Sequence, residues 1–286
     1  MLFPNRKPDF LTVSRMAALL MTGFFVLPHQ GMTQTAEEKG LAIAEEADRR
    51  DSGFGDSVAE LQMILSNRQG KISRRELKIK TLEVPEEGLG DKSLVIFDQP
   101  RDVKGTVLLT HSKILEPDDQ WMYLPALGQK GRIKRIDSRN KSGPFMGSEF
   151  AYEDMSSREV GKYRYKWLRD EPCGDGGDGS GGDLECFVVE SYPLYEDSGY
   201  SKLINWIDKQ EYRFQKIEFY NRRGDLLKTL TFSDYRKYLD KFWRAHDMYM
   251  VNALTGKTTR LLWSRFDFRV GLEERDFTRQ RMQIAK

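Results

Sequence analysis

Histidines and carboxylates are the side chains of this sequence that could carry acid–base chemistry, and they form no recognisable catalytic pattern. Beyond the first forty residues the chain has two histidines, His111 and His246. No H-E-x-x-H, G-x-S-x-G or Walker pattern occurs in the sequence. Adjacent carboxylates such as Glu153 and Asp154 point to opposite faces of a strand, or into solvent in a loop. We therefore expect no enzymatic activity, no catalytic residue, no cofactor and no bound metal.

The two cysteines of the sequence, Cys173 and Cys186, are separated by the twelve residues GDGGDGSGGDLE, six of which are glycine. An even pair this close is typical of a disulfide in an oxidising compartment. Closing a loop of this size is worth about 3 kcal/mol of stability on the chain-entropy model. A reactive thiol pair is the alternative, but the C-x-x-C spacing is missing. We therefore predict a disulfide that joins the strands KYRYKWL and CFVVESY.

The segment between the cysteines also carries oxygen ligands that a calcium ion could use, namely Asp175, Asp178, Asp183 and Glu185. Their spacing matches neither an EF-hand loop nor the stacked nonapeptide repeats that bind calcium in arrays. A weakly held cation and a flexible acidic hairpin tip are both compatible with this composition, and the hairpin tip is favoured.

The N-terminus has the composition of an export signal. Arg6, Lys7 and Arg15 precede a twelve-residue apolar run at 16–27, which is too short to span a bilayer. We predict that residues 1–36 are a cleaved secretory signal peptide and that residues 37–286 form a single exported domain in the periplasm. A signal anchor that stays in the membrane is the alternative.

The chain after the leader carries no net charge that would attract a nucleic acid. Of the 46 basic and 44 acidic residues, three basic and one acidic lie in the leader, so 43 of each sign remain. Binding by counterion release needs a basic surface, so nucleic acid is excluded as a partner. The basic segments GKISRRELKIK and RIKRIDSRNK could contact anionic lipid headgroups or face solvent.

Alternation of polar and apolar residues with period two dominates the sequence after residue 58. RELKIKT, GTVLLTH, QWMYLPAL and GRIKRI alternate, and the runs flanking NRRG and residues 255–256 predict two hairpins. A helical pattern is clear at 36–51, with Leu41, Ala44 and Ala47 on one side. The sequence predicts a mainly β fold, a half-open, strongly curved antiparallel β-barrel of about ten strands with a few lid helices.

The segment SGPFMGSEFAYEDMS is unusual because it combines turn residues with large apolar side chains. Phe145, Met146, Phe150, Tyr152 and Met155 lie among Pro, Gly and Ser residues that exclude a regular helix or strand. Two interpretations are open. The segment could fold back over the end of a core, or it could be a flexible lid over an apolar cavity.

Five separated stretches resemble one family of exported proteins. They are FDQPRDVKGTVLLTH, WMYLPALGQKGRI, SGPFMGSEFAYEDM, KIEFYNRRGDLLKTL and YMVNALTGKTTRLLW. In order and spacing they are similar to periplasmic proteins of the outer-membrane lipoprotein-sorting type, relatives of the lipoprotein carrier LolA. The resemblance covers essentially the whole chain after the leader. It implies a half-open antiparallel β-barrel with helices as a lid, whose concave apolar face receives acyl chains.

The resemblance also implies a ligand and a set of partners. Lipid or lipoprotein acyl chains are the expected cargo, and the wider family is associated with membrane exporters of the resistance-nodulation-division (RND) type. We expect a monomeric, non-enzymatic carrier that passes its cargo between membranes or to and from such a transporter. The residues expected to line the cavity or its lid are Trp121, Tyr123, Phe145, Met146, Phe150 and Tyr152.

A scaffold is the alternative to a carrier. The same barrel could be packed solidly by its own side chains and dock on a membrane protein complex as an accessory subunit, without lipid. The volume of the cavity distinguishes the two.

Overall fold

The computed structural model describes residues 34–86, 88–127, 131–174 and 184–285. The chain divides into two units, Met1–Thr33 and Gln34–Lys286, and all described residues belong to the second. The predicted signal peptide and most of the acidic loop with its candidate calcium ligands lie outside the described residues. The cleaved leader and the single exported domain therefore stay predictions.

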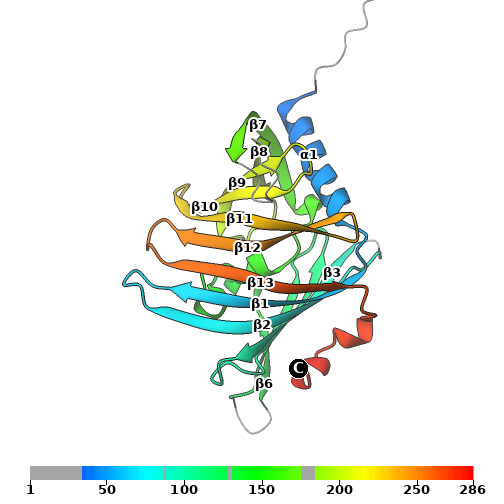
Figure 1. The fold of residues 1–286 in the computed structure, drawn as a ribbon, viewed down its shortest axis with the longest axis vertical. Helices are drawn as coiled ribbons and strands as arrows, with labels where there is room; N and C mark the ends of the chain where they lie inside the picture. The colour runs from blue at the N-terminus through cyan, green and yellow to red at the C-terminus, as the bar shows by residue number, and fades with distance from the viewer. Residues whose placement is uncertain (1–33, 87, 128–130, 175–183, 286) are drawn as a thin grey trace, which may run out of the picture. The chain divides into compact units, whose positions relative to one another are not determined.

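Thirteen antiparallel strands form one curved sheet that does not close, so far as the described residues show (Figure 1). From edge to edge the strand order is β6-β5-β4-β3-β2-β1-β13-β12-β11-β10-β9-β8-β7. The strands are β1 (Asp56–Ser66), β2 (Ile72–Leu82), β3 (Leu89–Gln99), β4 (Val107–Lys113), β5 (Asp119–Leu124), β6 (Arg132–Ile136), β7 (Tyr163–Gly174), β8 (Leu184–Pro193), β9 (Tyr200–Asp208), β10 (Phe214–Asn221), β11 (Leu226–Tyr238), β12 (Phe242–Asn252) and β13 (Thr258–Phe268). The predicted fold class is confirmed, whereas about ten strands is too few.

The miscounted strands lie where the sequence signal is weakest. Strand β9, with the sequence YSKLINWID, has a pair of apolar residues on each side of Asn205 and lacks the alternation that marks a half-exposed strand. The segment YRKYLDKFW contains the end of β11, a tight turn and the start of β12. In that turn Leu239 and Asp240 have φ angles of 49° and 55°, a conformation that favours glycine. No glycine therefore marks the turn in the sequence.

The described residues contain one α-helix, α1 (Ala36–Asp51), which begins at a capping box. The Thr35 side chain accepts a hydrogen bond from the backbone N–H of Glu38, and the Glu38 carboxylate accepts one from the backbone N–H of Thr35. The helix lies beside β7, β8 and β9 at one end of the sheet (Figure 1). The predicted helix is therefore confirmed.

The buried face of α1 consists of three small residues and one large one, Gly40, Ile43, Ala44 and Ala47. A Cβ atom on Gly40 would lie only 2.7 Å from the backbone nitrogen of Trp167, so at this position the helix approaches β7 too closely for any larger residue. Leu41, expected on the buried side, is 40% exposed instead, because Ile43 is the large apolar residue that packs against the sheet.

The two faces of the sheet are covered differently. The concave core, which lies on the inner face, contains Leu61, Met63, Leu77, Val95, Phe97, Leu108, Met122, Leu203, Ile217, Phe219, Leu230, Met250 and Leu261 together with side chains of the segment after β6. On the other face, Phe277 and Met282 of the C-terminal tail pack over β3, β4 and β5 (Figure 1). A curved sheet of this size thus buries its outer face partly under its own tail.

Residues 137–162 connect β6 to β7, the two edge strands of the sheet, and we call them the crossing segment. Its Phe145 and Phe150 side chains belong to the concave core, which draws on both halves of the sheet. The segment has no long helix or strand and consists of short 3-10 turns. Met146 and Gly147, with φ angles of 50° and 76°, make one of these turns.

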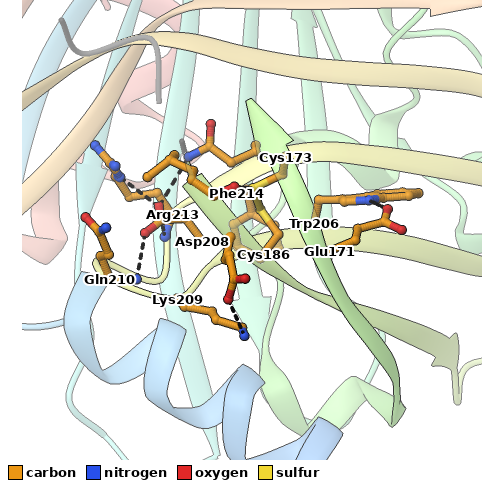
Figure 2. The surroundings of a disulfide bond; sticks show 12 residues. Glu171, Cys173, Cys186, Trp206, Asp208, Lys209, Gln210, Arg213 and Phe214 are labelled. Carbon is orange, nitrogen blue, oxygen red and sulfur yellow. Dashed lines mark hydrogen bonds and ion pairs between the residues drawn. A yellow bond between two sulfur atoms is a disulfide. The ribbon is translucent and has the colours of Figure 1, made fainter. Parts of the chain in front are cut away.

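The predicted disulfide is confirmed and links β7 to β8 (Figure 2). The Cys173 and Cys186 sulfur atoms are bonded, and the two Cα atoms lie 5.7 Å apart. Figure 2 also shows Trp206 beside the disulfide, where its indole N–H donates to the Glu171 carboxylate. This cluster stabilises the edge of the sheet on which α1 rests.

Candidate functional site

The six residues expected to bind a ligand fall into two groups. Phe145, Met146, Phe150 and Tyr152 lie together in or against the concave core. Trp121 and Tyr123 alternate with Met122 on β5 and therefore point to the opposite face, where they pack with the C-terminal tail. Tyr123 also lines a separate cavity near residues 283–285. The structure thus brings four of the six residues together, and contact of any of them with a ligand stays a prediction.

Phe145 is the centre of the first group and is completely buried. Its ring centroid lies 5.7 Å from that of Phe97 and 5.5 Å from that of Tyr152. Its backbone N–H donates to the Phe150 carbonyl at 2.7 Å, which closes the segment into a tight loop. These contacts are those of a packed core.

A buried ion pair fixes the crossing segment to β11. The Lys228 ammonium donates to the Asp154 carboxylate at 2.6 Å and to the Glu149 carbonyl at 2.8 Å. The two side chains are only 4% and 8% exposed. Asp154 also accepts hydrogen bonds from the Tyr200 hydroxyl at 2.8 Å and the Ala151 N–H at 2.7 Å. An ion pair with this many hydrogen bonds holds its backbone firmly.

A second carboxylate anchors the same turn to the β8–β9 loop. Glu153 accepts hydrogen bonds from the Tyr195 hydroxyl at 3.1 Å, the Ser198 hydroxyl at 2.9 Å and the Gly199 N–H at 2.9 Å. Burial, reinforced by the neighbouring Asp154, raises the pKa of Glu153. The anchoring network therefore favours the interpretation that the crossing segment closes one end of the core over the interpretation that it is a flexible lid.

Beyond the crossing segment the concave face is hollow under α1. Two adjoining cavities of about 420 Å³ and 580 Å³ share the lining residues Ala47, Asp51, Phe54, Asp91 and Phe214. We call them together the α1 cavity. Each volume lies within the range of about 300–1,000 Å³ that small-molecule sites occupy.

The wall of the α1 cavity is mainly apolar. Some of these side chains also pack against the concave core, so the hollow is a direct continuation of the filled part. The apolar and aromatic lining residues are Ala44, Ala47, Phe54, Ala59, Ile79, Val84, Leu89, Ile114, Val160, Tyr163, Tyr165, Val189, Leu203, Ile207, Tyr212, Phe214, Phe232, Tyr235, Trp243, Ala245, Met248, Trp263 and Phe266. Such a wall suits a hydrocarbon guest.

Carboxylates gather at one side of the α1 cavity. Asp48 of α1, Glu83 of the β2–β3 loop, Asp91 of β3 and Glu159 of the crossing segment all line it. Burial, followed by the nearby carboxylates of Glu159 and Glu83, raises the pKa of Asp91 to about 7. Burial likewise raises the pKa of Glu159. This side of the cavity therefore disfavours an additional negative charge.

Arg158 is the one basic residue among the described residues that line the 420 Å³ cavity. The basic residues Arg49, Arg50, Arg213, Lys237, Lys241 and Arg244 line the adjoining 580 Å³ cavity. The Arg158 guanidinium carbon lies 5.6 Å and 5.7 Å from the ring centroids of Phe214 and Phe219. One of its N–H groups donates to the Asn205 side-chain oxygen at 3.4 Å. The sequence analysis missed both Arg158 and Asn205. The signal that could have found Asn205 is its place as the one amide within the apolar strand β9.

Other classes of site are not visible in the part of the chain that the structure describes. No cluster of three or more His, Cys, Asp or Glu side chains there is arranged to hold a metal ion. Among the same residues, no helix has the length and hydropathy to cross a bilayer. The α1 cavity is therefore the feature that we consider further.

Comparison with known families places the chain among proteins of this fold. A family model with the description "uncharacterized protein" matches residues 90–284. No protein of curated function gives a significant match. A crystal structure from Vibrio parahaemolyticus, described as a candidate outer membrane lipoprotein-sorting protein domain, has 55% sequence identity and a TM-score of 0.79. The similarity covers 86% of this chain and 99% of that one.

Two further crystal structures are similar over the same length. A DUF1329 family protein from Desulfovibrio piger has 27% identity and a TM-score of 0.78, over 87% of this chain and 99% of its own. A LolA superfamily protein from Nitrosomonas europaea has 22% identity and a TM-score of 0.65, again over 87% and 99% of the two chains. The last likeness is one of fold alone.

Proposed function

Because the chain belongs to the LolA-like family of outer-membrane lipoprotein-sorting-like proteins, we propose that it is a periplasmic carrier without enzymatic activity. Its cargo is a lipid or the acyl chains of a lipoprotein, held in the α1 cavity. The observation that carries this proposal is the apolar hollow under α1, where the sheet leaves its inner face uncovered. Each methylene group buried there contributes about 0.8 kcal/mol to binding.

In this proposal the two structures that cover the concave face have different tasks. The crossing segment is a fixed floor, because buried ion pairs hold it to the sheet. The helix α1 is the movable cover, because polar contacts that hold it, such as that of Arg50, lie at exposed side chains. Cargo then enters and leaves when α1 shifts. Phe145, Met146, Phe150 and Tyr152 belong to this floor, in the filled part of the concave face.

The carrier needs a donor and an acceptor of its cargo. We propose that it receives or delivers the cargo at a membrane transporter of the RND type, after export by a cleaved signal peptide. The net charge of zero after the leader fits a protein that moves freely between membranes.

Lipid carried by the native protein tests the proposal. The protein is purified from its own host without detergent, extracted with organic solvent, and the extract is analysed by mass spectrometry. We expect a lipid in near-stoichiometric amount, and we expect the delipidated protein to gain thermal stability when that extract is returned, since a ligand of the native state raises the melting temperature. A protein that carries no lipid and gains no stability from any lipid extract contradicts the carrier.

The filled half of the concave face favours a second candidate, the scaffold. Phe145 and Phe150 pack there as in any solid core. If the purified protein brings a membrane complex in stoichiometric amount whether or not lipid is present, the scaffold replaces the carrier.

A further inference from the structure

Arg158 is a cation without a carboxylate partner in a cavity whose walls are mostly apolar. In the described residues it makes no ion pair, whereas the buried cations Lys162 and Arg213 pair with Asp118 and Asp208. Arg158 is an exposed residue that lines the 420 Å³ cavity, so its guanidinium is accessible to a guest there.

Neighbouring residues hold the guanidinium in one place. The rings of Phe214 and Phe219 lie within 6 Å of it, the distance at which a cation is attracted to an aromatic face. Asn205 is 3% exposed. Its side-chain nitrogen donates hydrogen bonds to the Val189 carbonyl at 3.1 Å and to the Ser191 hydroxyl at 2.8 Å. Its oxygen is therefore turned toward Arg158.

These contacts hold an exposed arginine in one orientation. A buried amide with two other hydrogen bonds orients one N–H group of the guanidinium, and two rings support its flat face. The remaining N–H groups of the planar fork are those with which arginine binds carboxylate or phosphate oxygens in pairs.

Carboxylates line the same 420 Å³ cavity. Asp48, Glu83, Asp91 and Glu159 repel an anionic guest where they gather, so within this cavity the anion is attracted to Arg158. The other basic residues of the α1 cavity line the adjoining 580 Å³ cavity.

We propose that Arg158, positioned by Asn205, binds the oxyanion of an amphiphilic guest whose hydrocarbon chain fills the α1 cavity. The shared chemistry is a carboxylate or phosphate group on an acyl or alkyl chain. This inference rests on the proposed carrier function, because it assumes that a hydrocarbon chain enters the α1 cavity.

Three single-chain amphiphiles test this proposal, and they differ only in their head group. Dodecanoate, dodecyl phosphate and dodecanol are titrated calorimetrically into delipidated protein at pH 8, below their micellar concentrations. We expect at least one of the two anions to bind about 10- to 100-fold more tightly than dodecanol, the range that a charge-assisted hydrogen-bonded pair supplies. The anion that binds more tightly shows whether the site prefers a carboxylate or a phosphate group.

Variants of the arginine complete the test. Arg158→Gln should remove the preference for the anion and leave dodecanol binding unchanged, which also shows that the variant is folded. Arg158→Lys should retain part of the preference, since it keeps the charge without the planar fork. The control is Arg164→Gln, an exposed arginine on β7 whose guanidinium lies over Tyr192 on the other side of the strand.

The outcomes separate the two proposals. If dodecanol binds and neither anion is preferred, or if Arg158→Gln keeps the preference, the anion site is wrong and the carrier stands. If none of the probes binds to the wild-type protein, both the anion site and the carrier proposal are overturned for single-chain guests.

Discussion

The two ends of the concave face belong to the same sheet but are covered in different ways. At one end the crossing segment inserts Phe145 and Phe150 between the strands and fixes its backbone with the Lys228–Asp154 pair. At the other end α1 buries Ile43 beside three small residues and leaves the α1 cavity beneath it. Two phenylalanines fill their end of the curved sheet, whereas the mostly small face of α1 does not fill the other end. The difference shows where a guest has room.

The polar contacts of the crossing segment and of α1 also differ. The crossing segment is held by buried groups such as Glu153, which accepts three hydrogen bonds from the β8–β9 loop. The helix α1 is held mainly at its rim, for example by the Arg50 guanidinium, which donates to the Gln210 carbonyl at 2.8 Å. Exposed contacts of this kind contribute little and are easily exchanged for water. The floor is therefore stable where the cover is weakly held.

Breaking the anchor of the floor should have the largest effect on stability. Lys228→Met leaves the Asp154 carboxylate buried without its cation, which costs about 3–5 kcal/mol of unfolding free energy. The measurement is urea unfolding followed by circular dichroism. The control Lys104→Met breaks an exposed pair with Asp98 and should cost less than about 1 kcal/mol. Equal losses in the two variants would mean that the crossing segment is not anchored as described.

Asp91 of the α1 cavity should make the protein less stable as the pH rises, whereas a carboxylate in an ion pair makes a protein more stable as the pH rises. The pKa of Asp91 is raised from 3.8 to about 7 in the folded protein. The folded state then binds more protons than the unfolded state between these values, so stability falls as pH rises from about 4 to about 7. Above pH 7 the ionised, partly buried Asp91 destabilises the fold by about 2–4 kcal/mol.

Asp91→Asn removes this penalty. The variant should be more stable than the wild type at pH 8 by about 1–3 kcal/mol and nearly equal to it at pH 4, measured by urea unfolding across the pH range. Glu159, Glu83, Asp48 and Ser157 surround the group and are unchanged in the variant. Asp98→Asn, an exposed carboxylate on the same strand, is the control and should not alter the pH profile. An Asp91→Asn profile parallel to that of the wild type would contradict the account.

Much of the fold could be predicted from alternation, and the site could not. Polar–apolar alternation is a local property, so it indicates the class of the sheet and both predicted hairpins. It does not reveal the turn at Leu239 and Asp240, because no glycine marks the turn and leucine is not typical of a positive φ. It also misleads at Leu41, because Ile43 is the large apolar residue of α1 that packs against the sheet.

The site depends on which distant residues meet. Phe145 and Phe150 are equally compatible with a lid or a core, and only their burial in the concave core distinguishes the two. Arg158 and Asn205 lie 47 positions apart in the chain, and their meeting follows from the path of the crossing segment and the register of β8 with β9. Register is set by the whole sheet, so single-sequence patterns do not reach it.

Mapping the contact of a photoreactive fatty acid tests the central claim most directly. A dodecanoate that carries a diazirine near its methyl end is bound to the delipidated protein, irradiated, and its adducts are located by tandem mass spectrometry. The account predicts adducts on the walls of the α1 cavity, such as Phe54, Leu203 and Phe214. Adducts that fall instead among residues 142–156, or spread evenly over the surface, would contradict it.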